Sequence, residues 1–197
     1  MKILIVVESN AKAKKIQEFL KDQENQYICI ASYGHIEDLK KSEMSIDFQN
    51  WTAIYEFTNQ KAINNIKKLS KTVDVTYIAS DPDNEGSKIA DSISKILDKN
   101  MQRYRITFNE VTKSAILEAI ENKHKIDYNK VNCQIIRRLS DRLFGYKLSP
   151  LLWNYFNINT LSAGRVQSPV LACIVKNTNN VNNPNPEITY KIKGDFD

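Results

Sequence analysis

Three carboxylates occupy alternating positions in the stretch YIASDPDNEGSKIA (residues 77–90), namely Asp81, Asp83 and Glu85. Carboxylates this close together repel one another unless a cation compensates their charge. Mg²⁺ suits such a group, because it is a hard cation that one or two carboxylates commonly bind together with waters and substrate phosphates. The alternative is an acidic helix N-terminus, favoured by the helix dipole, whose carboxylates are only solvated. Because three acids stand at this one place, we predict a metal-binding or catalytic role.

The elements around the acidic stretch must position these carboxylates. The apolar run Val75–Ser80 predicts a buried strand, and apolar residues with helical spacing between 89 and 97 predict the helix that follows. Pro82 resists continuation of either element, and Gly86 permits a close approach of the backbone. We therefore expect the carboxylates on a strand-to-helix turn at the carboxyl edge of a sheet, where ligands bind in open α/β sheets.

A fourth acid, Glu8, stands in a similar setting near the start of the chain. It follows the predicted buried strand Ile3–Val7 and precedes a predicted helix, with Ser9 or Asn10 as the capping residue. Two such strand ends on one sheet edge can face each other. Lys12, one turn further on, could then reach a phosphate. Taken alone, Glu8 could equally be a solvated or capping acid.

Strands and helices alternate along the chain as far as about residue 126, which predicts an α/β fold with a mostly parallel sheet. The segment 37–50 reads as a polar connection. The predicted strands cover residues 3–7, 27–32, 51–57, 75–80 and 103–108, and the predicted helices include residues 13–20, 62–69, 89–97 and 112–122.

The pattern becomes mainly helical after residue 126. Asp127–Trp153 is predicted to be helical with an interruption at Gly145-Tyr146 and Pro150, and Ser162–Asn180 to begin as a loop and end as a helix. Val181–Pro186 has the composition of a linker, and Glu187–Asp197 alternates like a first strand.

The composition excludes several classes of protein. The 197 residues are 42% hydrophobic and 26% charged, which is typical of a globular protein. Because no apolar stretch approaches ~18 residues, we expect no transmembrane helix. The three cysteines, Cys29, Cys133 and Cys173, are far apart and favour small buried thiols in a reducing compartment over a disulfide framework or a zinc site.

The second half of the chain is rich in cations. Between Tyr128 and Pro186 the only acidic residue is Asp141, whereas the first half carries most of the carboxylates. This asymmetry suggests a polyanion such as nucleic acid as partner of the second half, and the alternative is a solvated basic face. The cations of this stretch are Lys130, Arg137, Arg138, Arg142, Lys147, Arg165 and Lys176.

Six motifs in order resemble the N-terminal part of the type IA DNA topoisomerases, and in particular the bacterial topoisomerase I group. They are ILIVVESNAKAKKIQEFL, ASYGHIEDL, ASDPDNEGSKIA, RITFNEVTKSAI, NCQIIRRLSDRLFGYKLSPLLW and LSAGRVQS. The resemblance covers nearly the whole chain. It implies a Rossmann-like Toprim domain over 1–125, part of a helical single-stranded-DNA-binding domain over 126–180, and a linker with the first strand of an arch domain over 181–197.

The resemblance also implies roles for individual residues. Asp81, Asp83 and Glu85 match the acidic Mg²⁺-binding motif; Glu8 matches a glutamate with acid/base or metal-assisted work at the scissile phosphate, and Lys12 a lysine that stabilises charge there. The matches to DNA-binding positions are His35, Arg138, Asp141, Arg142, Tyr146, Ser162, Arg165 and Gln167, and we expect Arg137 to join them. Arginine pairs with phosphate and tyrosine offers a stacking face, which agrees with this assignment. Asp141 is expected to orient Arg138 or Arg142.

The chain departs from the family pattern at four points, one of which is a connection after Gly34-His35 that is shorter than in many relatives. Asn84 stands where the family usually has arginine, and Ser87 where it usually has an acid. None of the nine tyrosines lies in the motif of the family's DNA-cleaving tyrosine. The chain is therefore expected to be an N-terminal fragment or a truncated relative, which binds Mg²⁺ and single-stranded DNA without forming the covalent link.

The resemblance implies an intact enzyme that relaxes negatively supercoiled DNA without ATP. We expect it to be a monomer, to have no membrane partner and to lie in a cytoplasmic, DNA-containing compartment. Two other readings stay open. One is a Toprim nuclease or primase, which uses similar carboxylates but would not need RRLSDRLFGY and LSAGRVQS. The other is a stand-alone module that binds single-stranded DNA.

Overall fold

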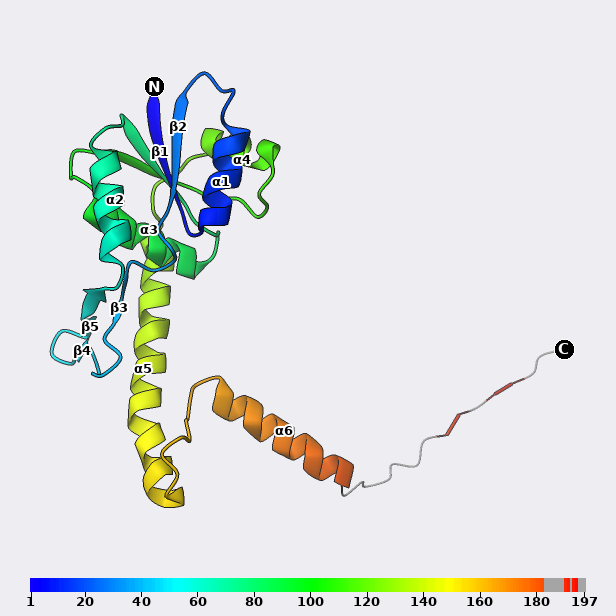
Figure 1. Ribbon diagram of the computed structural model, residues 1–197. Coiled ribbons are helices and arrows are strands. Elements are labelled where there is room, and N and C mark those ends of the chain that lie inside the picture. The colour runs from blue at the N-terminus through cyan, green and yellow to red at the C-terminus, as the bar shows by residue number, and fades with distance from the viewer. Residues whose placement is uncertain (183–189, 192, 195–197) are drawn as a thin grey trace. The chain divides into compact units, whose positions relative to one another are not determined.

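The computed structural model describes residues 1–182, 190–191 and 193–194. The chain separates into two compact units, Met1–Leu139 and Ser140–Asp197, and each is described by itself (Figure 1). The predicted strand 187–197 lies largely outside the described residues. The predicted domain boundary at residue 125 stays a prediction, because the division into compact units is a different measure.

A parallel four-stranded sheet forms the centre of the first unit (Figure 1), as the alternation of strands and helices predicts, and confirms the α/β class. Its strand order is β2-β1-β7-β8, and all three pairings are parallel. The strands are β1 (Lys2–Val7), β2 (Gln26–Ala31), β7 (Val75–Ala79) and β8 (Gln102–Ile106). Strands β1 and β7 are neighbours, so their carboxyl ends meet at one edge.

Helices cover both faces of this sheet (Figure 1). On one face α1 and α4 pack on side chains such as Ile3 and Ile5 of β1. On the other face α2 and α3 pack on Leu4 and Val6 of the same strand. Successive strand residues point to opposite faces, so a continuous apolar strand fills two cores at once. The helices are α1 (Asn10–Phe19), α2 (Gln60–Ser70), α3 (Asn84–Ile96) and α4 (Lys113–Glu121).

Both edge strands of the sheet are partly covered. The amide group of Gln17 on α1 donates to the carbonyl oxygen of Tyr27 at 2.9 Å and accepts from the backbone N–H of Cys29 at 2.8 Å. At the other edge, Arg105 and His124 exchange two backbone hydrogen bonds of 2.7 and 2.9 Å. These contacts occupy backbone groups that would otherwise be open to pairing with another chain.

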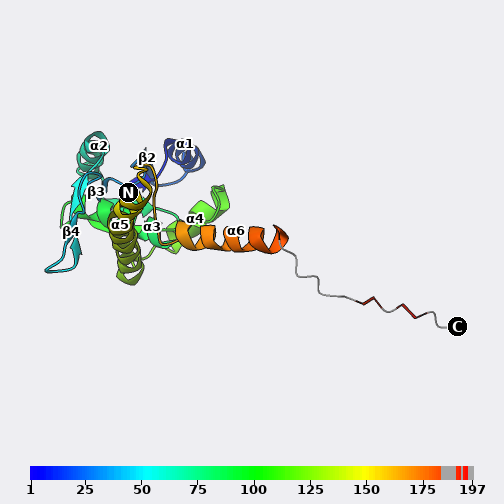
Figure 2. The same cartoon turned by 90° about the horizontal axis from the view of Figure 1, so that it is seen from below.

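The prediction of a polar connection over 37–50 is wrong, because this segment contains strands. Two short antiparallel pairs project from the sheet, and Figures 1 and 2 show the outer one at the tip of the first unit. Strands of two or three residues are too short for an alternating pattern to show in the sequence. The pairs join β3 (Glu37–Leu39) to β6 (Tyr55–Phe57) and β4 (Ile46–Asp47) to β5 (Thr52–Ala53).

Within the described residues, two helices follow α4. Helix α5 (Tyr128–Phe156) begins in the first unit and ends in the second, and α6 (Gln167–Asn182) is a single helix (Figure 2). The predicted interruption at Gly145 is not present, since α5 runs through it and through Pro150. Proline has no N–H, so the helix lacks one backbone hydrogen bond there.

The three cysteines are free, as expected, but they are not all buried. Cys29 is half-buried, whereas Cys133 on α5 and Cys173 on α6 are exposed, which corrects the prediction of buried thiols. α6 has no buried residue in this chain. In the described part of the chain no helix is both long and apolar enough to span a membrane.

Candidate functional site

The acidic stretch forms the turn between β7 and α3. Asp83 is the N-cap of α3, and its Oδ1 atom accepts a hydrogen bond of 2.7 Å from the backbone N–H of Gly86. A capping carboxylate at this position satisfies one of the free N–H groups of the first helical turn. Gly86 is required here, because a Cβ atom would collide with the carbonyl oxygen of Asp81.

A buried arginine holds this turn from the sheet side. Arg105 on β8 is 1% exposed, and its guanidinium donates to the carbonyl oxygen of Asp81 at 2.6 Å and to the hydroxyl of Ser80 at 3.1 Å. Burial lowers the pKa of Arg105, and the charges of Asp83, Asp127 and Glu8 oppose that shift. The sequence pattern did not single out this residue, which stands in a predicted strand with charged residues at alternate positions.

Ser87, one of the departures from the family pattern, is part of the same arrangement. It is fully buried, accepts a hydrogen bond of 2.6 Å from Nη1 of Arg105 and donates one of 2.8 Å to the carbonyl oxygen of Asp83. A neutral hydroxyl therefore stands opposite the buried guanidinium. Ser87 therefore contributes to the geometry of the turn through Arg105 and Asp83, and it does not face solvent.

The structure brings Glu8, Lys12 and Asp81 together, as expected from the neighbouring strand ends. Oε1 of Glu8 accepts from the backbone N–H of Asp81 at 3.1 Å. Nζ of Lys12 lies 2.7 Å from Oδ1 of Asp81 and 3.9 Å from Oε2 of Glu8. Ser9 caps α1, with its hydroxyl accepting from the backbone N–H of Lys12. The N-terminal turn of α1 thus directs Lys12 onto the acidic turn.

His35 reaches the same region from the loop after β2. Tyr33 and Gly34 both have positive φ, 62° and 83°, and the N–H of Gly34 donates to the carbonyl oxygen of Glu8 at 3.0 Å. This tight turn returns the chain toward α3, where glycine serves because it adopts positive φ without strain. Nε2 of His35 then lies 3.0 Å from Oε1 of Glu85.

The three carboxylates of the acidic stretch contact three different partners: Asp81 contacts Lys12, Asp83 caps α3 and Glu85 contacts His35. Within residues 1–182 and the few described beyond them, no three His, Cys, Asp or Glu side chains are gathered as metal ligands. The donor chemistry nevertheless fits Mg²⁺, which needs only one or two protein carboxylates when a phosphate completes its coordination. Lys12 is the cation that compensates Asp81 in this arrangement.

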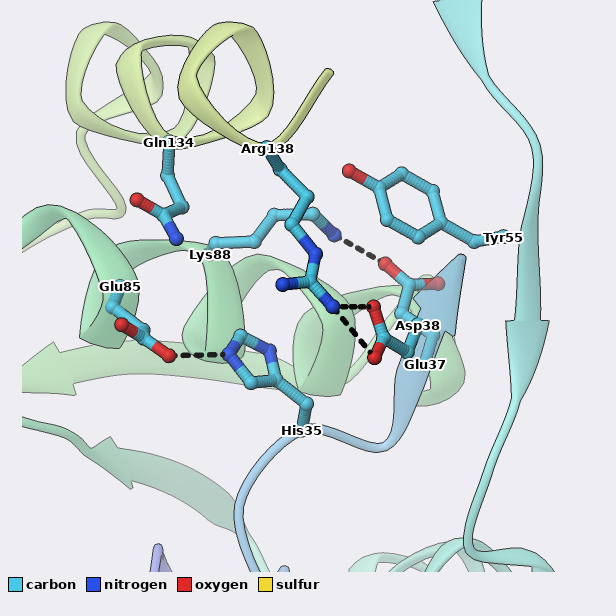
Figure 3. A pocket seen from close by; sticks show the side chains of 8 residues that line it. All are labelled: His35, Glu37, Asp38, Tyr55, Glu85, Lys88, Gln134 and Arg138. Atoms are coloured by element: carbon cyan, nitrogen blue, oxygen red, sulfur yellow. Dashed lines mark hydrogen bonds and ion pairs between the residues drawn. The ribbon is translucent and has the colours of Figure 1, made fainter. Parts of the chain in front are cut away.

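A small cavity of about 70 Å³ lies beside this turn (Figure 3). Arg138 of α5 points into it, and its Nη2 atom lies 2.6 and 2.8 Å from the two carboxylate oxygens of Asp38. Burial raises the pKa of Asp38, but the hydrogen bonds from Arg138 and from the N–H of Leu39 outweigh it, so the pKa is lowered. The lining residues are His35, Glu37, Asp38, Tyr55, Glu85, Lys88, Gln134 and Arg138.

Other predicted DNA-binding residues lie in the second unit. Nη1 of Arg142 donates to the hydroxyl of Tyr146 at 2.7 Å, and the guanidinium lies 4.8 Å from the centre of the tyrosine ring. Asp141 accepts a hydrogen bond of 2.9 Å from Nε of Arg165, a partner that the sequence did not suggest. Arg137 is exposed on the first-unit part of α5.

The loop before α6 is fixed to its own unit by several hydrogen bonds. Nε2 of Gln167 donates to the carbonyl oxygen and to the hydroxyl of Ser162, both at 2.7 Å. The hydroxyl of Ser149 accepts from the N–H of Ala163 at 3.1 Å, and Nε1 of Trp153 donates to the carbonyl oxygen of Leu161 at 2.6 Å. The loop that carries Arg165 is therefore ordered by α5 side chains.

Comparison with known proteins finds two families that match successive parts of this chain. Residues 3–111 match the Toprim domain family, and residues 125–197 match the DNA topoisomerase family. The chain is 39% identical over 193 residues to DNA topoisomerase 1 of Aquifex aeolicus (strain VF5), covering 96% of this chain and 35% of that protein.

A solved structure gives the same result. Full-length topoisomerase I from Thermotoga maritima matches with a TM-score of 0.78 at 39% sequence identity, over 90% of this chain and 30% of that chain. The chain therefore spans about a third of the length of the relatives that it matches.

Proposed function

Since this chain belongs to the Toprim-containing type IA DNA topoisomerases and is homologous to the N-terminal part of topoisomerase I, we propose that it supplies the metal-binding and strand-gripping part of an enzyme that relaxes negatively supercoiled DNA. The intact enzyme would cleave one strand transiently, pass another through the break and reseal it. The observation that carries this proposal is the meeting of Glu8, Lys12 and Asp81 at the carboxyl ends of β1 and β7.

The proposed chemistry assigns a role to each residue of this cluster. Asp81, with Asp83 and Glu85, would hold a divalent cation, for which we propose Mg²⁺, and Glu8 would contribute to the same site. The ion, when bound, neutralises charge on a phosphate. Lys12 would bind the scissile phosphate and stabilise the charge that develops on it. Glu8 would hold or accept a proton at an oxygen of that phosphate.

The remaining residues would bind single-stranded DNA. Arg138 and Arg165 would pair with phosphates, and the face of Tyr146, already in contact with Arg142, would stack on a base. In this proposal Asp141 orients Arg165, which is the pairing observed. The other members of the proposed DNA-binding set are His35, Arg137, Ser162 and Gln167.

Fluorescence anisotropy with a labelled single-stranded oligonucleotide tests the binding role. Phosphate contacts predict an affinity that falls steeply with salt, with a slope of about −0.7 per contact on logarithmic axes. Arg138→Ala and Arg165→Ala should each weaken binding and reduce that slope, whereas Lys21→Ala, a charge-matched control at an exposed position remote from the site, should not. Unchanged affinity in both arginine variants would refute the strand-gripping role.

The 197 residues by themselves should bind the oligonucleotide without linking to it. Denaturing gel electrophoresis after incubation with Mg²⁺ checks this, and a covalent adduct would contradict the assignment of the nucleophile to a tyrosine motif that this chain lacks. We also propose that the protein acts as a monomer in the compartment that holds the DNA. A nuclease or primase is not favoured, because residues 125–197 match the DNA topoisomerase family.

A further inference from the structure

Two charged residues beside the proposed site, one buried and one largely buried, have no role in the chemistry above. They are Glu37, the first residue of β3, and Lys88, on the second turn of α3. Their side chains are 11% and 5% exposed and form a direct ion pair (Figure 3). Removing two charges from water is costly, so a buried pair needs further hydrogen bonds to be tolerated.

Those further contacts are present around Lys88. Its ammonium donates to the hydroxyl of Ser92 at 2.9 Å, lies 3.7 Å from Oδ2 of Asp91 and lies 4.4 Å from the centre of the Tyr55 ring. Oγ of Ser92 also lies 2.8 Å from Oε1 of Glu37. Contacts from two segments, the β3–β6 pair and helix α3, therefore converge on one ammonium group.

The Glu37–Lys88 pair and the contact between His35 and Glu85 join the same two parts of the chain. Both pairs join the end of the loop and the start of β3 to the same helix, with His35 and Glu37 two positions apart and the two helix residues three apart (Figure 3). The side chains of His35 and Glu85 are 34% and 57% exposed, so their contact by itself contributes little to holding the loop. The buried pair is the contact that water screens least.

We propose that Glu37 and Lys88 are positioning residues, which hold the loop Ser32–Ile36 and the start of β3 against α3 and so keep His35 on Glu85 at the edge of the metal site. The expected effect on metal binding rests on the proposed function, whereas the contact of the loop with α3 does not depend on it. Thr58 also holds the loop, because its hydroxyl donates to the carbonyl oxygen of His35 at 3.0 Å and its backbone N–H to that of Ile36 at 2.9 Å. Ile36 packs in the same apolar core as Ile89 and Ile93 of α3, so the Glu37–Lys88 pair is the buried polar part of the contact between this segment and α3.

The test uses the double variant Glu37→Leu/Lys88→Met, because removal of one partner alone would leave a buried unpaired charge. If the double variant does not fold, Glu37→Gln replaces it, because glutamine keeps a hydrogen-bonding side chain and Lys88 still has the carboxylate of Asp91 at 3.7 Å. Lys40→Met is the control, since it removes the same charge from an exposed i, i+3 pair on the neighbouring segment. Each variant is studied as the full 197-residue chain.

Hydrogen exchange is the first measurement. In the double variant, amide exchange in a peptide that covers Gly34–Leu39 should accelerate at least about tenfold, while peptides of α1 exchange as in the parent. Equal exchange of both segments in parent and variant would overturn the proposal. This measurement does not depend on metal or DNA binding.

Mg²⁺ affinity is the second measurement. The double variant should bind Mg²⁺ on the order of tenfold more weakly, as expected when a supporting contact of a ligand is lost. His35→Ala should then add little in the double-variant background, because the contact is already lost. Full Mg²⁺ affinity in the double variant, or an additive effect of His35→Ala, would overturn the positioning role. A parent chain that does not bind Mg²⁺ would refute the proposed metal site. Hydrogen exchange would then still show whether Glu37 and Lys88 hold the loop against α3.

Discussion

The Nη2 atom of Arg105 lies 2.6 Å from the carbonyl oxygen of Asp81, so a side chain of the edge strand β8 fixes the acidic turn that follows β7. Two residues earlier on the same strand, Arg103 donates to the carbonyl oxygens of Ser94, Asp98 and Lys99 at 2.6–2.9 Å. These carbonyls lie at the C-terminal end of α3, where cations and donors are favourable. Alternate residues of β8 thus hold the two ends of one helix.

Arg105→Lys should destabilise the chain and weaken its metal binding. Lysine cannot reproduce the forked contacts with Ser80, Ser87 and Asp81, so we expect a loss of about 2–3 kcal/mol in the free energy of unfolding. Mg²⁺ affinity should fall on the order of tenfold. Urea denaturation and isothermal titration calorimetry measure the two effects.

Arg103→Lys is the matched control for this prediction. It changes the other end of α3 and should destabilise the chain without a comparable loss of Mg²⁺ affinity. If both variants lower Mg²⁺ affinity equally, the effect of Arg105 is general loosening of α3 and not the geometry of the acidic turn.

Lys12→Met should raise the Mg²⁺ affinity of the DNA-free chain. The ammonium of Lys12 compensates the charge of Asp81 at 2.7 Å, and a cation that approaches this carboxylate must compete with it. Loss of one positive charge this close is worth about 1 kcal/mol even in water, or roughly fivefold in affinity. Calorimetric titration with Mg²⁺ measures it, with Lys14→Met on the exposed side of α1 as the charge-matched control. A fall in affinity would show that Lys12 organises the carboxylates instead of competing for them.

Asp38→Asn should strengthen binding of single-stranded oligonucleotide. Both carboxylate oxygens of Asp38 contact Nη2 of Arg138, so an incoming phosphate must share or displace this partner. Removal of the negative charge should lower the dissociation constant roughly fivefold at low salt, and less as salt rises. Anisotropy titrations compare this variant with Asp22→Asn, which removes the same charge from an exposed loop. Equal affinities of the two variants would exclude competition at Arg138.

Tyr55→Phe should make the chain less sensitive to alkaline pH. Burial, with a further contribution from Glu37, raises the pKa of Tyr55 from 10.0 to about 12. The folded state therefore favours the neutral phenol, and this contribution to stability is fully present below pH 10 and is lost as pH rises from 10 to 12. Urea midpoints at pH 8, 10 and 11 should fall less steeply in the variant than in the parent. Parallel pH profiles would contradict the assignment.

The sequence predicted the parts of the fold that depend on local pattern. The apolar runs of β1 and β7 and the helical spacing of α3 place Glu8 and Asp81 at adjacent strand ends, and the structure has them in contact. Arg105 could not be predicted as a buried residue, because its partners lie on a turn 18–25 residues earlier in the chain. The same holds for Arg138 and Asp38, which are 100 residues apart.

Other failures have a local cause. The short strands β3 to β6 have too few residues to establish a period of two. The turn between β4 and β5 depends on Asp47, whose carboxylate accepts from the backbone N–H groups of Gln49 and Asn50. The helical residues around Gly145 and Pro150 read as an interruption, but α5 continues through them. A breaker residue indicates a cost to the helix, and the rest of the helix can outweigh it.

The position of Arg105 on an edge strand links the proposed metal site to the order of folding. Strand β8 has a sheet neighbour on one side only, β7, and the backbone contact with His124 on the other. A chain in which β8 has not yet docked contains Glu8 and the three carboxylates of the acidic turn. It lacks the guanidinium of Arg105, which holds that turn in shape. Metal competence should therefore appear only with the last strand of the sheet, and a transient detachment of that strand would abolish it while the rest of the core stays intact.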